Sequence, residues 1–313
     1  MEEDNPNIIE LEGFTKFYGS LKAIDSIDLH IPFGPVGLLG PNGAGKSTLI
    51  KCLLGLIDIS SGDARIFGTD MNETQKILDV RRSIGYMPES DCLIPEMDAI
   101  SFVSFMGELS GLPAMDSMQR AHEVLHYVGI GDERYRKIKT YSTGMKQKVK
   151  LAQAVVHDPK LVFLDEPTNG MDPKGREEML DLVLDISRNH GKNVIFSSHL
   201  LPDVEYICDH VIIMNQGRIL KQGYLRDLTR SLDRFEIRIK GDQDQFASIL
   251  NDLKLDYEIS GSYFRVRSEE NQLNRIYEAI RGTPIEIRKA SRSGRSLEEI
   301  FLSEIKGAGG GPS

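Results

Sequence analysis

Residues 40–47 read Gly40-Pro41-Asn42-Gly43-Ala44-Gly45-Lys46-Ser47. They fit the phosphate-binding P-loop pattern G-x-x-x-x-G-K-[ST] without a mismatch. The apolar run Pro35 to Leu39 before them is typical of a buried strand, and Thr48 to Leu54 after them repeats apolar residues at helical spacing. A glycine turn between a strand and a helix directs main-chain N–H groups and the helix N-terminus toward a phosphate. The pattern therefore predicts that Lys46 reaches the β- and γ-phosphates and that the Ser47 hydroxyl binds Mg²⁺.

A pair of acidic residues, Asp165 and Glu166, follows a second apolar run, Leu161 to Leu164. Ligands of open α/β sheets collect at the carboxyl ends of strands. Taken alone, such a pair is usually a helix cap or a solvated turn. Next to an intact P-loop, we expect Asp165 to hold Mg²⁺ directly or through water and Glu166 to orient and deprotonate the attacking water.

Two further segments can be interpreted in two ways from the residues alone. His199 follows the predicted strand Asn193 to Ser197, so it is either an ordinary surface or core histidine or an N–H donor to the γ-phosphate. Ser142 precedes the helical pattern Met145 to Val156 and resembles an N-cap. That segment is either a plain helix start or a second helix N-terminus suited to an anion.

The first predicted domain spans residues 1–225. Its first strands are Ile8 to Tyr18 and Ile24 to Ile31, which alternate imperfectly between apolar and polar residues. Residues 95–156 are mostly helical in pattern, and a later helix has Asp172 as N-cap with proline at its first position. The alternation of strands and helices predicts a largely parallel sheet with helices on both faces.

A smaller α+β domain is predicted at residues 234–306, joined by a charged linker at 226–233. Ser296 and Glu299 form a capping box for its last helix. The glycine-rich residues 307–313 are expected to be a loose tail. The domain's predicted elements, in an order that suggests a split βαβ fold, are strand Phe235–Ile239, helix Gln243–Leu253, hairpin Tyr257–Arg267, helix Gln272–Ile280 and strand Ile285–Arg288.

Composition limits the classes of function. The 313 residues carry 38 Lys and Arg against 47 Asp and Glu, a net charge of −9 with a pI near 5.4. This balance argues against a nucleic-acid binder, which normally carries a basic face. The three cysteines, Cys52, Cys92 and Cys208, predict no disulfide framework and fit a reducing compartment. Neither a membrane span nor a secretory signal is expected.

Together, the P-loop, the Ser142 segment, the acidic pair and His199 occur in the order of an ATP-binding-cassette (ABC) ATPase. The resemblance covers about Ile8 to Gln222. The chain is most similar to the separate nucleotide-binding subunit of an exporter. The resemblance implies an α/β P-loop NTPase fold, a RecA-like core with an antiparallel β subdomain and a helical subdomain, followed by a small α+β accessory domain.

Two positions depart from the family pattern. Glu89 stands where the family usually has glutamine; it can still bind Mg²⁺ and orient water, but it adds negative charge beside the triphosphate. The signature segment of the family, Leu-Ser-Gly-Gly-Gln, aligns with Tyr141–Met145 here. Ser142 and Gly144, the two positions expected to touch phosphate, are retained.

The resemblance also implies a set of roles. Lys46, Glu166 and His199 are the implied catalytic residues, with Glu166 as general base, and Ser47, Asp165 and Glu89 are the implied Mg²⁺ ligands. Tyr18 is expected to stack on adenine, and Asp172 ends the D-loop Asn169–Asp172. The implied ATP-binding residues are Tyr18, Gly40, Pro41, Asn42, Gly43, Ala44, Gly45, Lys46, Ser47, Thr48, Glu89, Ser142, Gly144 and Asp172.

Each ATP in this family lies between the P-loop of one cassette and the signature segment of another. The resemblance therefore implies a head-to-tail pair with a second ABC ATPase subunit. It also implies docking of the Met87–Met106 region on a multi-span permease, at the cytoplasmic side of the cell membrane. The alternatives are a cassette ATPase that remodels a protein or nucleic-acid complex and a nucleotide-binding regulator without turnover. A guanine-specific switch is disfavoured because no Asn-Lys-x-Asp segment occurs.

Overall fold

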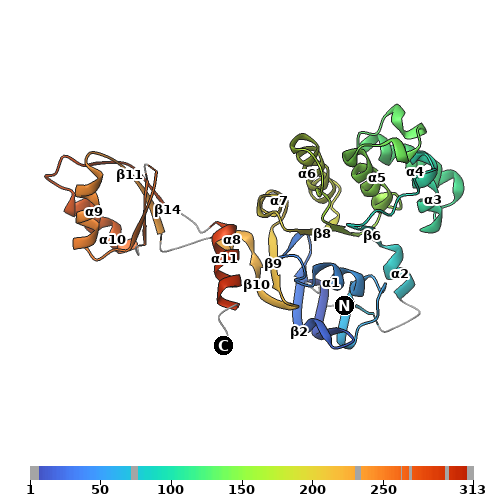
Figure 1. Ribbon diagram of the computed structural model, residues 1–313, viewed down its shortest axis with the longest axis horizontal. Coiled ribbons are helices and arrows are strands. Elements are labelled where there is room, and N and C mark those ends of the chain that lie inside the picture. The colour runs from blue at the N-terminus through green and yellow to red at the C-terminus, as the bar shows by residue number, and fades with distance from the viewer. Residues whose placement is uncertain are drawn as a thin grey trace, which may run out of the picture. The chain divides into compact units, whose positions relative to one another are not determined.

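The computed structural model describes residues 7–71, 77–229, 234–261, 263–267, 270–292 and 296–308 (Figure 1). The chain forms two compact units, the first ending at Tyr224 and the second spanning Leu225–Lys306. Within the described residues, no helix combines the length and the apolar character that crossing a bilayer requires.

A six-stranded sheet in the order β10-β9-β3-β8-β7-β6 organises the first unit. All neighbouring strands pair in parallel except β9 and β10, which form an antiparallel hairpin. Both β3 and β7 are buried along their whole length, as strands covered on both faces are. The predicted parallel sheet is thus confirmed. Its strands are β3 (Pro35–Leu39), β6 (Ile84–Met87), β7 (Leu161–Asp165), β8 (Asn193–Ser198), β9 (His210–Asn215) and β10 (Arg218–Tyr224).

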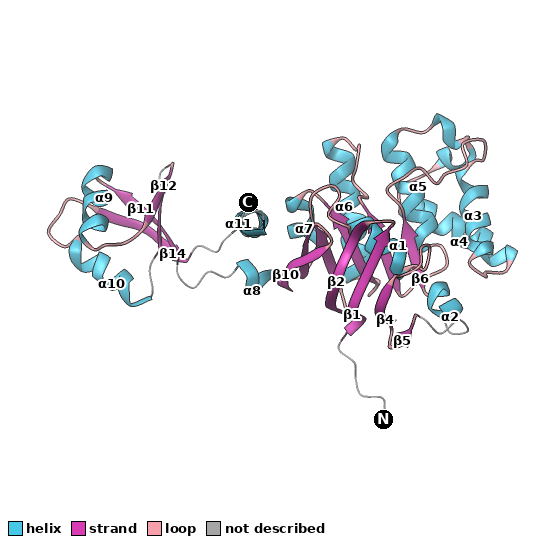
Figure 2. Ribbon diagram, turned by 60° about the horizontal axis from the view of Figure 1, so that its bottom comes forward, coloured by secondary structure: helices cyan, strands magenta, loops and turns pink. Residues whose placement is uncertain are grey.

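One face of this sheet packs on helix α1 (Lys46–Leu53) and on a second, four-stranded sheet, as Figure 2 shows. The second sheet is antiparallel where its strands pair, in the order β2-β1-β4-β5. Apolar side chains from both sheets and α1 form one continuous core cluster. The strands of the second sheet are β1 (Asn7–Tyr18), β2 (Leu21–Pro32), β4 (Ser61–Ile66) and β5 (Thr69–Asp70).

Two glycines bring helices close to the opposite face of the central sheet. A Cβ atom at Gly37 would overlap Val204 of helix α7, and one at Gly85 would overlap the main-chain carbonyl of Ala154 in helix α5. Any side chain at these two positions would therefore push α7 or α5 away from the sheet. The helices of this layer are α5 (Thr143–Val155), α6 (Pro173–Arg188) and α7 (Leu201–Ile207).

The region predicted to be helical, residues 95–156, is helical apart from its turns. Asp98 caps its first helix by accepting a 2.8 Å hydrogen bond from the Ser101 N–H. Its elements besides α5 are α3 (Ala99–Leu109), α4 (Ala114–Tyr127) and the 3₁₀ turns η1 (Asp132–Tyr135) and η2 (Ile138–Thr140), while α2 (Ile77–Arg82) precedes the region.

The second unit has the predicted order of strands and helices. Its antiparallel sheet runs β12-β13-β11-β14, and its core includes an edge-to-face contact of Phe246 with Phe264, with ring centroids 4.8 Å apart. The elements are α8 (Leu225–Thr229), β11 (Arg234–Lys240), α9 (Gln243–Asp252), β12 (Tyr257–Ser260), β13 (Tyr263–Arg267), α10 (Glu270–Ala279), β14 (Glu286–Arg292) and α11 (Leu297–Ala308).

Some predicted boundaries need correction. Residues 226–229 of the predicted linker lie in α8, where the Thr229 hydroxyl donates to the Leu225 carbonyl at 2.7 Å; residues 230–233 lie outside the described residues. Helix α11 continues through residues 307 and 308 of the predicted tail. Its last turn extends the i→i−4 hydrogen-bonding pattern past the amphipathic segment. Residues 309–313 lie outside the described residues. Ser296 caps α11 as predicted, its Oγ accepting from the Glu299 N–H at 3.1 Å.

Candidate active site

The P-loop lies where β3 ends and α1 begins, wedged against neighbouring strands. A Cβ atom at Gly40 would come within 2.5 Å of the Met214 carbonyl oxygen in β9. Gly45 adopts a left-handed φ of 105° and packs against the Ala23 carbonyl of β2. Because both glycines allow this close approach, the loop is held between two strands with its N–H groups at the head of α1.

A cavity of about 790 Å³ opens over this loop. Its size falls within the range usual for ligand sites. It is lined by Tyr18, Leu21, Lys22, Ala23, Asn42, Gly43, Ala44, Gly45, Lys46, Ser47, Thr48, Glu89, Glu166, Asn169, His199, Gln216 and Gly217. Eleven of these are residues that the sequence analysis assigned to the site.

The Lys46 side chain is buried and lies along the loop. Its Nζ donates to the Gly40 carbonyl at 2.8 Å and to the Pro41 carbonyl at 3.4 Å. The same Nζ lies 3.8 Å from Glu166 Oε1. The ammonium is therefore placed between the P-loop and the acidic pair.

The acidic pair lies at the carboxyl end of β7, as predicted. Asp165 is only 2% exposed, and its Oδ1 has no hydrogen-bond partner within the described part of the chain. Glu166 has a left-handed φ of 51°, and its N–H donates to the Ser197 carbonyl at 3.1 Å. A buried carboxylate oxygen without a partner is costly, so Asp165 is suited to a ligand that the protein itself does not supply.

His199 is brought against Glu166 by the neighbouring strand β8. Its Nδ1 lies 2.8 Å from Glu166 Oε2, so the Glu166 carboxylate lies between this imidazole and the Lys46 ammonium. Of the three side chains, His199 alone is half-exposed. The three residues predicted to be catalytic, Lys46, Glu166 and His199, therefore lie together at the edge of the cavity.

Six predicted site residues do not line this cavity. Gly40 and Pro41 belong to the P-loop and Asp165 to the acidic pair, but Ser142, Gly144 and Asp172 come from other segments. Ser142 is the N-cap of α5, its Oγ accepting from the Met145 N–H at 3.3 Å, and Asp172 caps α6 by accepting from the Gly175 N–H at 3.3 Å. Gly144 lies in the first turn of α5. These residues therefore present helix N-termini away from their own chain's P-loop cavity.

The sequence analysis missed the part of the wall that the β9–β10 hairpin provides. Gln216 and Gly217 form its turn with φ of 48° and 75°, and both line the cavity. Two consecutive left-handed residues are typical of a two-residue hairpin turn. The Asn215-Gln216-Gly217 sequence was the available signal, but nothing in it indicated a position beside the P-loop.

A buried network missed by the sequence analysis joins the loops that carry Glu166 and His199. Asp203 is fully buried in α7, four residues after His199. Its Oδ2 accepts from the Thr168 hydroxyl at 2.8 Å and its Oδ1 from the Arg176 Nε at 2.7 Å. Because Thr168 follows Glu166 by two residues, Asp203 fixes both loops to each other.

We expect Asp203→Asn to lower the free energy of unfolding by about 2 kcal/mol, since hydrogen bonds to a buried charge are weakened and one is lost. Urea unfolding followed by circular dichroism measures this change. Asp181→Asn is the matched control, because Asp181 is an exposed carboxylate that accepts a hydrogen bond from the Tyr206 hydroxyl at 2.6 Å. Equal stability of the two variants would contradict the role given to Asp203.

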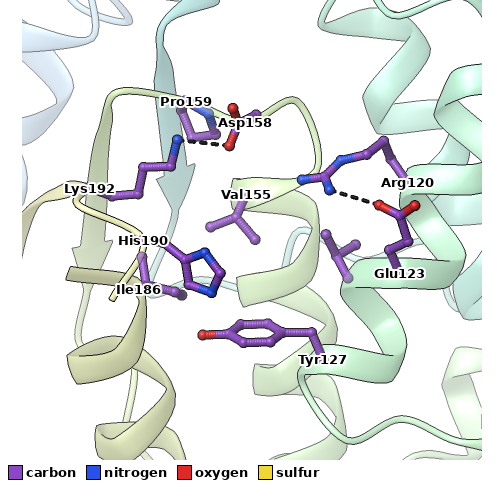
Figure 3. Close-up of a pocket in the computed structure, with 10 residues that line it drawn as sticks. Arg120, Glu123, Tyr127, Val155, Asp158, Pro159, Ile186, His190 and Lys192 are labelled. Carbon is purple, nitrogen blue, oxygen red and sulfur yellow. Dashed lines mark hydrogen bonds and ion pairs between the residues drawn. The ribbon is translucent and has the colours of Figure 1, made fainter. Parts of the chain in front are cut away.

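A second cavity, of about 230 Å³, lies between the ends of α4, α5 and α6 (Figure 3). Its charged groups neutralise one another: Arg120 pairs with Glu123 at 2.8 Å and Lys192 with Asp158 at 2.7 Å. Burial, followed by the hydrogen bond to Asp185, raises the pKa of Tyr127 well above its ordinary value. The residues that line this cavity therefore include no counterpart of the Lys46–Glu166–His199 cluster.

Comparison with known proteins agrees with the site. The model of the ABC transporter family matches residues 24–169. The chain is 39% identical to YxlF of Bacillus subtilis, an uncharacterized ABC transporter ATP-binding protein, over 71% of this chain and 72% of that one. It is 32% identical to the bacitracin transport ATP-binding protein BcrA of Bacillus licheniformis, over 96% and 98% of the two chains. The daunorubicin/doxorubicin resistance ATP-binding protein DrrA of Streptomyces peucetius is also 32% identical, over 94% and 91%.

Solved structures show the same likeness. CbiO1 of Clostridium perfringens, part of the ABC transporter complex cbiONQ, is 26% identical with a TM-score of 0.64, over 80% of this chain and 97% of that chain. A dimeric structure of MJ0796, a bacterial ABC transporter cassette, is 25% identical with a TM-score of 0.64, over 70% of this chain and 99% of that chain.

Proposed function

The chain belongs to the ABC transporter family as an ATP-binding, ATP-hydrolysing subunit, and from this premise we propose that it energises export through a separate membrane permease. The observation that carries the proposal is the Glu166 carboxylate held between Lys46 and His199 at the edge of the P-loop cavity. Export is favoured because BcrA and DrrA, matched over nearly their whole length, are named for bacitracin transport and for drug resistance.

In the proposed complex, the triphosphate of ATP lies over the P-loop. Main-chain N–H groups of the loop and the N-terminus of α1 face the phosphates, where the helix dipole favours negative charge. The Lys46 ammonium exchanges its carbonyl partners, Gly40 and Pro41, for the β- and γ-phosphates. The half-exposed Tyr18 ring forms the platform for adenine.

Mg²⁺ would be held by Asp165, Ser47 and Glu89 together with phosphate oxygens. The unpartnered Oδ1 of Asp165 supports this assignment. Among the described residues, no cluster of three or more His, Cys, Asp or Glu side chains could hold a metal ion by itself. Mg²⁺ commonly combines one or two carboxylates with substrate phosphates and water, and Asp165 and Glu89 are the two carboxylates proposed here. When bound, the ion supplies charge neutralisation for phosphoryl transfer.

Glu166 is the proposed general base. It accepts a proton from the attacking water, while the bond from His199 Nδ1 to Oε2 fixes the orientation of the carboxylate. The other ring nitrogen of His199 donates to the γ-phosphate only in the imidazolium form, in which both ring nitrogens carry a proton. Hydrolysis then needs positioning and charge neutralisation, which Lys46 and the loop N–H groups supply.

A second subunit would complete the site. Ser142, Gly144 and Asp172 do not line their own chain's cavity, and Ser142 and Asp172 lie at the surface. Two helix N-termini approaching one triphosphate neutralise more charge than one. In the proposed head-to-tail dimer, the signature segment of each subunit covers the nucleotide on the other.

The permease is proposed to dock on the Met87–Met106 region at the cytoplasmic side of the membrane. Ile94 and Phe105 are large apolar side chains there, each more than two-fifths exposed. Most other apolar residues of the region are buried core. Exposed apolar side chains of this kind suit a short amphipathic helix of a partner.

Two measurements test the proposal against its alternatives. Phosphate release from Mg-ATP separates an ATPase from a regulator without turnover. Capture of the tagged chain from a detergent extract separates a transporter subunit, which should bring down a multi-span membrane protein, from a cassette that remodels soluble complexes. Recovery of only soluble partners would contradict the permease assignment.

We expect Tyr18→Ala to raise the Kd for ATP at least about fivefold, since stacking of a base on an aromatic ring contributes ~1–3 kcal/mol. Titration with a fluorescent ATP analogue measures the change. Phe17→Ala is the matched control, because Phe17 is exposed to nearly the same extent (43% against 46%) but is not among the residues that line the cavity. Equal affinities of the two variants would exclude stacking on Tyr18.

A further inference from the structure

Three buried polar side chains on α5 donate to main-chain carbonyls outside the helix. Gln147 Nε2 donates to the Asn169 carbonyl at 3.0 Å, and Gln153 Nε2 donates to the Tyr86 carbonyl at 2.7 Å. Between them, Lys150 Nζ donates to the Glu89 carbonyl at 3.0 Å. Helix α5 therefore holds the loop after β6 and the loop after β7, both of which border the P-loop cavity.

Lys150 is the charged member of this set and is only 4% exposed. A buried lysine is costly unless its charge is compensated. Burial lowers the pKa of Lys150 below its ordinary value, while the charges of Cys92, Asp91, Glu89 and Asp165 act in the opposite direction. The contact that the structure gives this ammonium is with the main-chain carbonyl of Glu89, whose residue lines the P-loop cavity.

Lys146, one turn before Lys150 on α5, does not supply a buried positive charge. Lys146 lies 3.9 Å from Asp91, but both side chains are substantially exposed, at 35% and 61%. Exposed ion pairs contribute little because water screens them. The buried positive charge behind the Glu89 loop is therefore that of Lys150.

We propose that Lys150 is a positioning residue that fixes the Glu89 loop to α5 and offsets the negative charge which Glu89 adds beside Mg-ATP. This inference rests on the proposed binding of Mg-ATP in the P-loop cavity. Because α5 also carries Ser142 and Gly144 at its N-terminus, the same bond links the Glu89 loop to the surface offered to the second subunit. Glu89 and Lys150 would then act as a pair, and the effect of changing one depends on the other.

A double-mutant cycle tests this dependence. We expect Lys150→Met to lower kcat about tenfold, because the charge of Glu89 is then left uncompensated beside the triphosphate. In a Glu89→Gln background, where the extra charge is absent, the loss should shrink to about twofold or less. A difference of this size is typical of residues that interact directly. Equal losses in both backgrounds would overturn the proposal.

Gln153→Met is the matched control, since it removes a buried donor of α5 that carries no charge. Its effect should be the same with Glu89 and with Gln at position 89. Thermal unfolding checks that each variant folds, and if Lys150→Met does not, Lys150→Gln keeps a donor while removing the charge and enters the same cycle. If it shows no coupling with Glu89→Gln, the proposal fails.

Binding measurements separate failure of this inference from failure of the proposed function. The Kd for Mg-ATP and for ATP with EDTA is measured for all four members of the cycle. A wild-type chain that binds neither would refute the proposed site itself. A wild-type chain that binds Mg-ATP, with additive effects of the two substitutions, would refute only the role of Lys150.

Discussion

Glu166→Gln should bind ATP and form dimers but hydrolyse ATP at least ~10²-fold more slowly than the wild-type chain, the low end for loss of a general base. The amide keeps the shape of the carboxylate and its contact distance to His199, but it cannot accept a proton from water. Removal of the negative charge also relieves repulsion with the triphosphate. ATP should therefore stay bound and hold two subunits together.

Single-turnover phosphate release and analytical ultracentrifugation with Mg-ATP measure these two effects. Glu177→Gln is a suitable control, because Glu177 is an exposed carboxylate on α6 that does not line the cavity. Near-normal turnover of Glu166→Gln would remove this residue from the role of base. If Glu166→Gln sediments as a monomer at saturating ATP, in a buffer that does not disrupt association, the shared site is contradicted.

The chemistry of the cavity was predictable because phosphate binding restricts residue types at fixed spacings. The P-loop needs small residues where the chain passes close to Met214 and Ala23, and it needs a lysine at its end. The acidic pair was predictable because β7 is wholly apolar up to Asp165. A catalytic role for His199 was implied by the resemblance to ABC ATPases, whereas the residues alone left its role open.

The wall formed by the β9–β10 hairpin could not be predicted in the same way. Gln216 lies beside the P-loop because β9 pairs with β3. Paired residues of these two strands are about 175 positions apart in the sequence. Strand order in a parallel sheet is set by packing of the intervening helices and not by a local pattern. The four-residue strand β6 was also missed as a strand, since Gly85 interrupts its apolar run.

The sequence analysis also missed two buried charged residues. Lys150 and Asp203 are charged residues on helices, and charged residues are expected at the surface. Helix α5 is buried along most of its C-terminal two-thirds, so polarity there does not indicate exposure. Lys150 is tolerated at this buried position because of groups on other elements. These are the Glu89 carbonyl and the negative charges of Asp91, Glu89 and Asp165.

Mixing two inactive variants should restore ATP hydrolysis. Lys46→Ala removes the cation at the phosphates, and Gly144→Asp places a carboxylate where the partner subunit's γ-phosphate would approach. Each change alone should slow hydrolysis at least ~10²-fold, as loss of one preorganised charge-stabilising group does. The nearest atom to a Cβ at Gly144 would be Met171 Cε at 3.5 Å, an ordinary contact, so the variant should fold.

In a mixed dimer, one site combines the intact P-loop of the Gly144→Asp chain with the intact signature segment of the Lys46→Ala chain. Equal amounts mixed before ATP is added give mixed dimers in about half of the pairs, each with one of two sites intact, so about a quarter of wild-type turnover should return. Mixing either variant with the double variant cannot rebuild an intact site and serves as the control. If the first mixture hydrolyses no faster than its components, no active site has been rebuilt between two chains, and the shared site is contradicted.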